Sequence, residues 1–414
     1  MAGDVLVTAL SGADHVVVVG AGLAGWRFAQ SLRRDGYDGA LTLIGAEPYA
    51  PYDRPPLSKQ VLAGKWDVDK TTLATPELVS SLDVVLRLGV AATALDVATT
   101  TVHLADGVQV AGTHVVIATG SRARHVAYSA GDLALTLRTR DDLIRLRHDL
   151  SFIEPGGVIA IIGGGFIGAE AATALHSLGY TPIVLEAAAR PLVGILGDDV
   201  SRWLGNLATD AGIELRNDQR IGDVEYRDDR FVVRFDDGSA LEAAAVIVAA
   251  GASVNDEWLA TSGLTIDNGV VVDADLLATD RVGAIGDVAR FMWSNTLGEE
   301  LVRIEHWQIA NDHATALARL WATGRRSEDP LVPYFWSDQY GKKIQMLGHA
   351  RPDDDVRIVK GAVEEGKWLA VFSRGGVVSG VVTLSQPRAL MLSKGLLDVR
   401  TTLDQALELA PWSA

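Results

Sequence analysis

The sequence of 414 residues predicts an α/β fold with two parallel sheets, each built around a strand, a glycine-rich turn and a helix. The first observation behind this fold class is VVVVGAGLAG at residues 16–25, which leads into the helical pattern WRFAQSLRRDGY. The second is its repetition at residues 158–180, VIAIIGGGFIGAEAATALHSLGY. Four β-branched residues in a row suit a strand buried on both faces. Chance seldom places two such copies in one chain, so we expect two domains of the same kind.

The glycines of the first copy stand where a nucleotide-binding turn needs them. Gly20 permits the tight turn, Gly22 lets the backbone approach a pyrophosphate, and Gly25 lets the helix pack closely on the strand. The N-terminus of the helix would direct unpaired N–H groups at the anion. One copy is a weak signal, but the pair indicates two dinucleotide-binding domains. The second copy has Gly163, Gly165 and Gly168 in the same spacing.

An acidic residue follows each copy. ALTLIGAE reaches Glu47 and TPIVLE reaches Glu186, which lie 22 and 18 residues past the last glycine of their copies. A carboxylate at such a position can accept hydrogen bonds from the ribose of an adenosine. At Glu186 it would also repel a 2′-phosphate, which favours NADH over NADPH. Arg190 is close enough in the sequence to complicate that preference.

The composition bounds the class of protein. With 48% hydrophobic and 22% charged residues the chain is ordinary for a soluble globular protein. Its longest apolar runs, such as AAAVIVAAGASV, are shorter than the roughly 18 residues of a spanning helix. The first fourteen residues lack the basic start and apolar middle of a signal peptide, so the cytoplasm is expected. The net charge of −16 argues against a nucleic-acid binder.

The chain contains no cysteine, which excludes disulfides, thiolate metal sites, iron–sulfur clusters of its own and any redox-active cysteine pair. Its nine histidines show no ligand spacing. His306 and His313 could share a helical face, but no carboxylate or thiolate partner stands at the usual offsets. No metal site is therefore predicted.

The order of the remaining segments predicts the domain boundaries. THVVIATG and AAVIVAAG each return a strand to their own sheet, and VGAIGDVAR would be the last strand of the first sheet. From about Pro330 short antiparallel strands are followed by helices. We predict a discontinuous first domain over 1–122 and 253–329, a second domain over 123–252, and a C-terminal α+β domain over 330–414.

Eight motifs, in this order, resemble the FAD-dependent NADH:ferredoxin reductases of bacterial oxygenase systems, the family of putidaredoxin reductase and rubredoxin reductases. They are VVVVGAGLAG, PYDRPPLSK, VIATGSRAR, LRTRDDLIRL, IIGGGFIGAE, AIGDVARF, VRIEHWQIA and PYFWSDQYGKKIQMLG. The resemblance covers essentially the whole chain, and PPLSK, EHW and FWSDQY are its most specific parts. It implies two Rossmann-like dinucleotide-binding domains on the glutathione-reductase-like plan and a C-terminal α+β domain.

The resemblance also implies FAD on the first domain and NADH on the second. The residues implied for FAD are Gly20, Gly22, Ala24, Gly25, Glu47, Arg54, Lys59, Ala92, Thr119, Gly120, Arg138, Asp287 and Trp307. Those implied for NAD are Gly163, Gly165, Phe166, Ile167, Gly168 and Glu186. Gly251 is a further lining residue, although VAAGASVND around it departs from the glycine-rich stretch and Pro-Asn of the family. The turn SQP at 385–387 also departs from the Asn-containing turn of relatives.

Three residues carry the implied chemistry. Trp336, together with Trp307, is a candidate wall of the slot in which nicotinamide and flavin stack, the alternative being an ordinary core tryptophan. Lys59 in PPLSK would be partly buried, and Glu170 is its partner in the family. A positive charge there would favour the negative charge that reduction brings to the flavin. The alternative is a structural salt bridge.

The electron acceptor follows from the absence of cysteine, because no thiol can take electrons from the flavin. We expect a separate iron–sulfur ferredoxin, the chain itself being a monomer or homodimer. From Pro330 onward the chain has ten Lys and Arg and nine Asp and Glu, which is a net charge of +1. Because the whole chain carries −16, residues 1–329 carry −17. Because ferredoxins are generally acidic, the near-neutral last domain is the expected docking region. Its candidate residues are Lys342, Lys343, Arg388, Lys394 and Arg400.

Two other functions remain open. One is a flavin NADH oxidase or a membrane quinone reductase, but DVRTTLDQALELAPWSA at the C-terminus is too acidic and sparse for a membrane-binding helix. The other is a signalling role like that of apoptosis-inducing factor, which the acidic charge disfavours.

Overall fold

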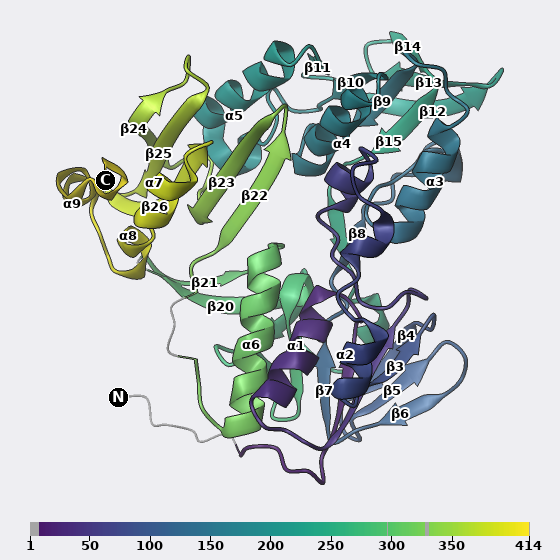
Figure 1. Ribbon diagram of the computed structural model, residues 1–414, viewed down its shortest axis with the longest axis vertical. Helices are drawn as coiled ribbons and strands as arrows, with labels where there is room; N and C mark the ends of the chain where they lie inside the picture. Colours follow the sequence, from purple (N-terminus) through teal and green to yellow (C-terminus); the bar gives the residue numbers. More distant parts are fainter. Residues whose placement is uncertain (1–7, 296, 328–330, 414) are drawn as a thin grey trace. The chain divides into compact units, whose positions relative to one another are not determined.

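The structure is a computed structural model that describes residues 8–295, 297–327 and 331–413 (Figure 1). The chain divides into two compact units, and each is described by itself. Unit 1 comprises Met1–Asp53, Thr72–Arg122 and Val254–Tyr334, and unit 2 comprises Arg54–Thr71, Ala123–Ser253 and Phe335–Ala414. The division into three domains stays a prediction, and its boundary residue Pro330 lies outside the described residues.

Unit 1 is built on a six-stranded sheet of order β18-β19-β7-β1-β2-β3, parallel except for β18. Valines 16 to 19 of β1 are fully buried, as their β-branched run predicts. β19 pairs with β7, which confirms that VGAIGD supplies a late strand of the first sheet. The strands are β1 (His15–Val19), β2 (Ala40–Gly45), β3 (Val85–Leu88), β7 (His114–Ile117), β18 (Leu277–Thr279) and β19 (Val282–Ala284).

Two helices of unit 1 lie side by side (Figure 1). They are α1 (Leu23–Arg34) and α6 (Trp307–Thr323), and the rings of Phe28 and Trp321 meet edge-on at 5.7 Å between centroids. The remaining elements of unit 1 are α2 (Pro76–Ser81), the sheet of β4 (Ala92–Asp96), β5 (Thr101–Leu104) and β6 (Gln109–Ala111), and the sheet of β17 (Val270–Val272), β20 (Ala289–Asn295) and β21 (Gly298–Val302).

Unit 2 contains a second parallel sheet of order β11-β10-β9-β15, which confirms the predicted repeat. Its elements are α3 (Arg140–Leu150), β9 (Val158–Ile162), α4 (Phe166–Ser177), β10 (Thr181–Leu185), β11 (Glu214–Arg216) and β15 (Ala245–Val248). An antiparallel meander precedes β15 and consists of β12 (Ile221–Arg227), β13 (Arg230–Phe235) and β14 (Ala240–Ala243). The short strands β8 (Ser121–Ala123) and β16 (Ala252–Val254) stand where the chain passes between the units.

The C-terminal part of unit 2 is a five-stranded sheet of order β22-β23-β26-β25-β24. Trp368 and Phe372 form its buried core with Leu196 and Leu204 of α5 (Val193–Asp210). The strands are β22 (Tyr334–Gln339), β23 (Lys342–Gly348), β24 (Asp355–Ala362), β25 (Lys367–Arg374) and β26 (Val377–Leu384). The helices α7 (Pro387–Leu392), α8 (Gly395–Asp398) and α9 (Leu403–Leu409) follow, so the predicted α+β character is confirmed.

The PPLSK motif runs into a single turn of π-helix, Leu57–Val61, and this segment belongs to unit 2. Two properties of the described residues bear on function. None of their helices combines the length and the apolar character needed to cross a bilayer. No three of their His, Asp or Glu side chains group in a way that could hold a metal ion.

His313 of α6 is a buried titratable group of unit 1. Its side chain lies edge-on to the ring of Phe291 at 4.4 Å between centroids, and the residue is 2% exposed. Burial lowers the pKa of His313 to about 3, with Asp287 acting weakly in the opposite direction. The unfolded chain therefore takes up a proton near pH 6.5, where the folded protein does not.

We predict that the free energy of unfolding falls as the pH drops below about 6.5, because protonation favours only the unfolded state. At about pH 5 the loss from His313 is about 2 kcal/mol. His313→Leu should lack this part of the loss. Denaturant unfolding of both proteins at about pH 7.5 and about pH 5 measures it, and an equal loss in both proteins would contradict the prediction.

Candidate active site

The first glycine turn joins β1 to α1 in unit 1. Gly20 has a φ of +123°, and a Cβ there would lie 2.1 Å from the carbonyl oxygen of Ala118. A Cβ at Gly25 would lie 2.0 Å from the carbonyl oxygen of Gly20. A Cβ at Gly22 would meet nothing within 4 Å, and Gly22 is the N-cap residue of α1, where no side chain caps the helix. Gly20 and Gly25 therefore serve the fold, while Gly22 leaves open space at a helix N-terminus, which suits a phosphate.

The second turn, between β9 and α4 in unit 2, has the same design. Gly163 has a φ of +110° and its Cβ would lie 2.4 Å from the carbonyl oxygen of Ala249. A Cβ at Gly168 would lie 2.0 Å from the carbonyl oxygen of Gly163. Gly165 again faces open space and is the N-cap residue of α4, where no side chain caps the helix. Both turns therefore fit a dinucleotide pyrophosphate.

Each predicted acidic residue is held at the carboxyl end of its strand. The Tyr52 hydroxyl donates to Oε2 of Glu47 at 2.5 Å. In unit 2 the backbone N–H of Gly164 donates to Oε2 of Glu186, and that of Ala188 donates to Oε1, both at 2.8 Å. Each oxygen of Glu186 keeps further acceptor capacity, because a carboxylate has about four lone-pair sites. Glu186 is thus fixed beside its glycine turn and can still accept from ribose hydroxyls.

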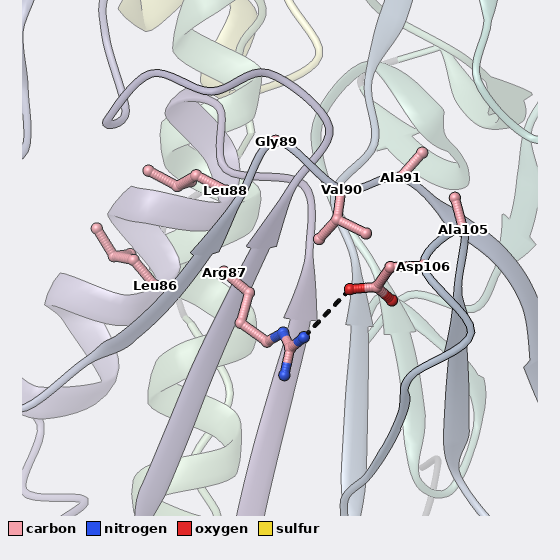
Figure 2. A pocket seen from close by; sticks show the side chains of 8 residues that line it. All are labelled: Leu86, Arg87, Leu88, Gly89, Val90, Ala91, Ala105 and Asp106. Carbon is pink, nitrogen blue, oxygen red and sulfur yellow. Dashed lines mark hydrogen bonds and ion pairs between the residues drawn. The ribbon is translucent and has the colours of Figure 1, made fainter.

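A hollow of about 660 Å³ adjoins the strand end that leads to Glu47. The N–H of Gly89 donates to the carbonyl oxygen of Glu47 at 3.0 Å, which ties the wall of the hollow to β2. Figure 2 shows the Arg87 side chain directed at Asp106, 3.5 Å away. The lining residues are Leu86, Arg87, Leu88, Gly89, Val90, Ala91, Ala105 and Asp106, directly before and beside the predicted Ala92.

The turn that carries Asp287 lies against the first helix. A Cβ at Gly286 would approach Cβ of Ala24, in the first turn of α1, to 3.0 Å. The Asp287 carboxylate accepts a hydrogen bond from the Ser121 hydroxyl at 2.8 Å. The structure therefore brings Asp287 and Ala24 together at the first glycine turn, although 263 positions separate them in the numbering.

The other residues predicted for unit 1 are held by specific hydrogen bonds. Thr119 donates from Oγ1 to the carbonyl oxygen of Asn255 at 2.7 Å. The N–H of Asn255 donates to the carbonyl oxygen of Gly120 at 3.0 Å. Trp307, the first residue of α6, donates from Nε1 to the Asp53 carboxylate at 2.8 Å. The Trp307 ring is thereby fixed at the start of its helix.

Unit 2 holds the remaining residues predicted for FAD, so the predicted set is divided between the two units. The Arg54 guanidinium donates to the carbonyl oxygen of Arg138 at 3.1 Å. Gly251 has a φ of +94°, and its carbonyl oxygen accepts from the N–H of Arg124 at 3.0 Å.

A buried ion pair of unit 2 lies in a cluster of polar side chains around Glu170. Lys59 Nζ lies 2.9 Å from Oε1 of Glu170, and their side chains are 11% and 3% exposed. The Ser58 hydroxyl donates to Oε2 at 2.6 Å, and the Ser337 hydroxyl donates to Oε1 at 2.5 Å. An ammonium and two hydroxyls therefore compensate a carboxylate that has lost its water, as a buried ion pair requires. The predicted pairing of Lys59 with Glu170 is present in the structure.

Strand β22 carries both Ser337 and Trp336. Phe335 packs on Phe166, the first residue of α4, with 4.8 Å between ring centroids. Successive strand residues face opposite sides, so Trp336 points away from the side on which Phe335 and Ser337 contact α4. Ile167, which follows Phe166, is 39% exposed.

Sequence reasoning did not identify the neutral partners of the predicted charged residues. Ser58 stands beside Lys59 in PPLSK, so its motif was a usable signal. Ser337 lies 167 positions from Glu170, and no local pattern pointed to their contact. Tyr52 and Ser121 were missed for the same reason, because each hydroxyl finds its carboxylate only in the folded chain.

Two glycine turns that each fit a dinucleotide are typical of an oxidoreductase that uses two nucleotide cofactors. Residues 14–314 match the pyridine nucleotide-disulphide oxidoreductase family, and residues 334–411 match the reductase C-terminal family. The chain is 34% identical over 398 residues to the ferredoxin reductase component of chlorobenzene dioxygenase from Cupriavidus sp. (strain PS12), covering 95% of each chain. It is 31% identical to putidaredoxin reductase from Pseudomonas putida, covering 95% of this chain and 94% of that one.

Among solved structures, the covalent putidaredoxin reductase–putidaredoxin complex matches with a TM-score of 0.88 and 31% identity over 93% of each chain. The chain belongs to the pyridine nucleotide-disulphide oxidoreductase family, and within it to the ferredoxin reductases of oxygenase systems. This membership confirms the predicted family, fold class and kind of enzyme, together with FAD and NAD(H) as cofactors.

Gly168 and Gly165 of the second turn should respond differently to an added methyl group. Gly168→Ala should lower the free energy of unfolding by roughly 3 kcal/mol, because the Cβ collides with backbone. Gly165→Ala should leave stability unchanged and weaken ADP-ribose binding about tenfold or more, because its Cβ enters the space that a pyrophosphate needs. Denaturant unfolding measures the stability of each variant, and calorimetric titration measures its affinity for ADP-ribose. An unstable Gly165→Ala protein, or one that binds ADP-ribose normally, would contradict this assignment.

Proposed function

We propose that the protein is an NADH:ferredoxin reductase that holds FAD at the turn of unit 1 and NADH at the turn of unit 2. The observation that carries this proposal is the pair of uncapped glycine turns, each with an anchored carboxylate, in a chain without cysteine. A hydride can pass from one such cofactor to the other when their rings are stacked. Because no thiol is present to accept the electrons, they must leave to a separate molecule.

The binding roles divide between the two turns. For FAD we propose that the open face at Gly22 accepts the pyrophosphate, that Glu47 accepts from the ribose, and that the hollow beside β2 accommodates the adenine end. The other residues proposed for FAD are Gly20, Ala24, Gly25, Arg54, Lys59, Ala92, Thr119, Gly120, Arg138, Asp287 and Trp307. For NADH they are Gly163, Gly165, Phe166, Ile167, Gly168, Glu186 and Gly251.

Bound FAD would accept a hydride from NADH and release the two electrons one at a time. The contribution of Lys59 is a positive charge that three contacts around Glu170 keep in place. Glu170 neutralises part of this charge, but because the pair lies in a water-poor environment, water screens the field of Lys59 less than that of a solvated lysine. Lys59 would thus stabilise negative charge that develops on reduction, with Glu170 as its positioning residue and Trp336 as a wall of the slot.

We predict that Lys59→Met slows flavin reduction by NADH about 10- to 100-fold while FAD is retained, because one positive charge is removed from the reacting region. Stopped-flow absorbance under anaerobic conditions measures the rate. Lys65→Met is the matched control, since it removes an exposed lysine from the same segment.

The double variant Lys59→Met, Glu170→Gln guards against misfolding, because it leaves no unpaired buried carboxylate. A reduction rate equal to that of the unchanged protein in either Lys59 variant would reject the role given to Lys59.

A face of the C-terminal helices suits an acidic iron–sulfur partner. Three apolar side chains are exposed there: Met391 by 55%, Leu392 by 42% and Val399 by 63%. Exposed basic residues stand among them, and Lys394 forms an ion pair with Asp398 at 3.1 Å. Apolar contact area ringed by positive charge is the pattern that recognises an acidic protein. We define the α7–α8 face as Arg388, Met391, Leu392, Lys394, Val399 and Arg400.

The predicted lysines stand on β23, whose backbone is hydrogen-bonded to a residue that precedes α7. The N–H of Ser385, just before α7, donates to the carbonyl oxygen of Lys343 at 2.8 Å. Lys343 is engaged with Asp338 at 2.7 Å, so its charge is partly neutralised. The strongest positive contribution to docking is therefore assigned to Arg388 and Arg400, which are exposed.

The test of the proposed function is NADH-dependent cytochrome c reduction with and without an acidic [2Fe–2S] ferredoxin. We predict a yellow protein that NADH bleaches and that reduces cytochrome c rapidly only when the ferredoxin is added. Arg388→Glu should lower the ferredoxin-dependent rate about three- to tenfold at low ionic strength, because rim charges act mainly on association. Lys367→Glu, an exposed lysine at the start of β25, is the control.

Rapid oxygen consumption or cytochrome c reduction without ferredoxin would instead indicate an NADH oxidase or a quinone reductase. A flavoprotein that NADH reduces but that passes electrons to none of these acceptors would favour a signalling role. We further propose a cytoplasmic location, because NADH is an intracellular electron donor, and cell fractionation tests it.

A further inference from the structure

Arg190 stands in the loop that follows Glu186 and would be a natural partner for a 2′-phosphate. The loop is fixed at both sides of this residue. Ala188 donates its N–H to Oε1 of Glu186 at 2.8 Å, and a Cβ at Gly164 would lie 3.4 Å from Cβ of Pro191. Arg190 is therefore attached between two residues that contact the carboxylate and the glycine turn. A guanidinium at such a place can bind a phosphate through two hydrogen bonds.

The Arg190 guanidinium is already engaged. It forms an ion pair with the carboxylate of Asp198, and the two side chains are 34% and 58% exposed. Asp198 stands where α5 is interrupted, because Gly197 has a φ of +70° and a ψ of 177° inside that helix. The acid thus begins a new helical segment, where the positive end of the helix dipole stabilises its charge.

We propose that Asp198 is a coenzyme-specificity residue, which neutralises Arg190 and so leaves Glu186 to decide against a 2′-phosphate. The inference rests on the proposed binding of NADH at the second turn and goes beyond it. Glu186 alone repels the phosphate, but a released Arg190 beside it would attract the same group. Glu186, at the proposed ribose site, and Asp198, which pairs with Arg190, therefore act together to favour NADH.

The test compares binding of ADP-ribose and 2′-phospho-ADP-ribose to the FAD-loaded protein by calorimetric titration. Asp198→Asn keeps the shape of the side chain and removes its charge. We expect the preference for ADP-ribose over its 2′-phosphate to fall about fivefold, which is the scale of one solvent-exposed ion pair. The ratio of kcat/KM for NADPH to that for NADH should rise by a similar factor.

Two variants distinguish this role from a general effect of charge. Asp199→Asn removes the neighbouring acid, which pairs with Arg202 on the same helix, and should leave the preference unchanged. Arg190→Gln combined with Asp198→Asn should restore the original preference, because the released guanidinium is then absent.

The outcomes separate the two proposals. Normal ADP-ribose binding with an unchanged preference in Asp198→Asn would overturn the role of Asp198 alone. An equal shift in Asp199→Asn would overturn it as well, since long-range charge would then explain the result. Failure of the unaltered protein to bind either ligand would reject the dinucleotide site itself, and the inference with it.

Discussion

The constraint on which the site depends is the close approach of backbone to backbone at two glycine turns. At both turns the first and third glycines touch carbonyl oxygens so closely that no Cβ fits. This contact holds each helix start at the end of its strand. The middle glycine faces open space, so the helix N-terminus is available to an anion. The same backbone geometry therefore explains the packing of the sheets and the binding of two dinucleotides.

Electrostatics adds the second level of organisation. In each unit a carboxylate near the turn is oriented by a donor from the chain: a tyrosine hydroxyl for Glu47 and two backbone N–H groups for Glu186. Glu170, by contrast, is buried and holds the Lys59 ammonium with the help of two serine hydroxyls. The two partly exposed acids can thus bind sugar hydroxyls, whereas the buried acid positions a cation. The burial and the hydrogen-bond partners of each glutamate therefore decide whether it binds a sugar or positions a cation.

Much of the fold could be predicted from the sequence, because its signals are local. The valine run of β1, the glycine spacing before α1 and α4, and the late strand β19 all appear as short patterns. The π-helical turn Leu57–Val61, which overlaps PPLSK, was harder to predict, since one turn of π-helix has no strong sequence signal. In the site, the Lys59–Glu170 pair could be predicted only because the sequence resembles a known family. Ser337 could not be found, because only the folding of β22 against α4 brings its hydroxyl to Glu170.

Each chain should provide two separate dinucleotide sites, one for FAD and one for NAD. The most direct measurement is the stoichiometry of binding to the purified protein, with flavin absorbance for FAD and calorimetric titration with ADP-ribose for the second site. We expect one FAD and one ADP-ribose to bind per chain at the same time, without competition. A colourless protein that retains no flavin, or an ADP-ribose that displaces FAD, would contradict it.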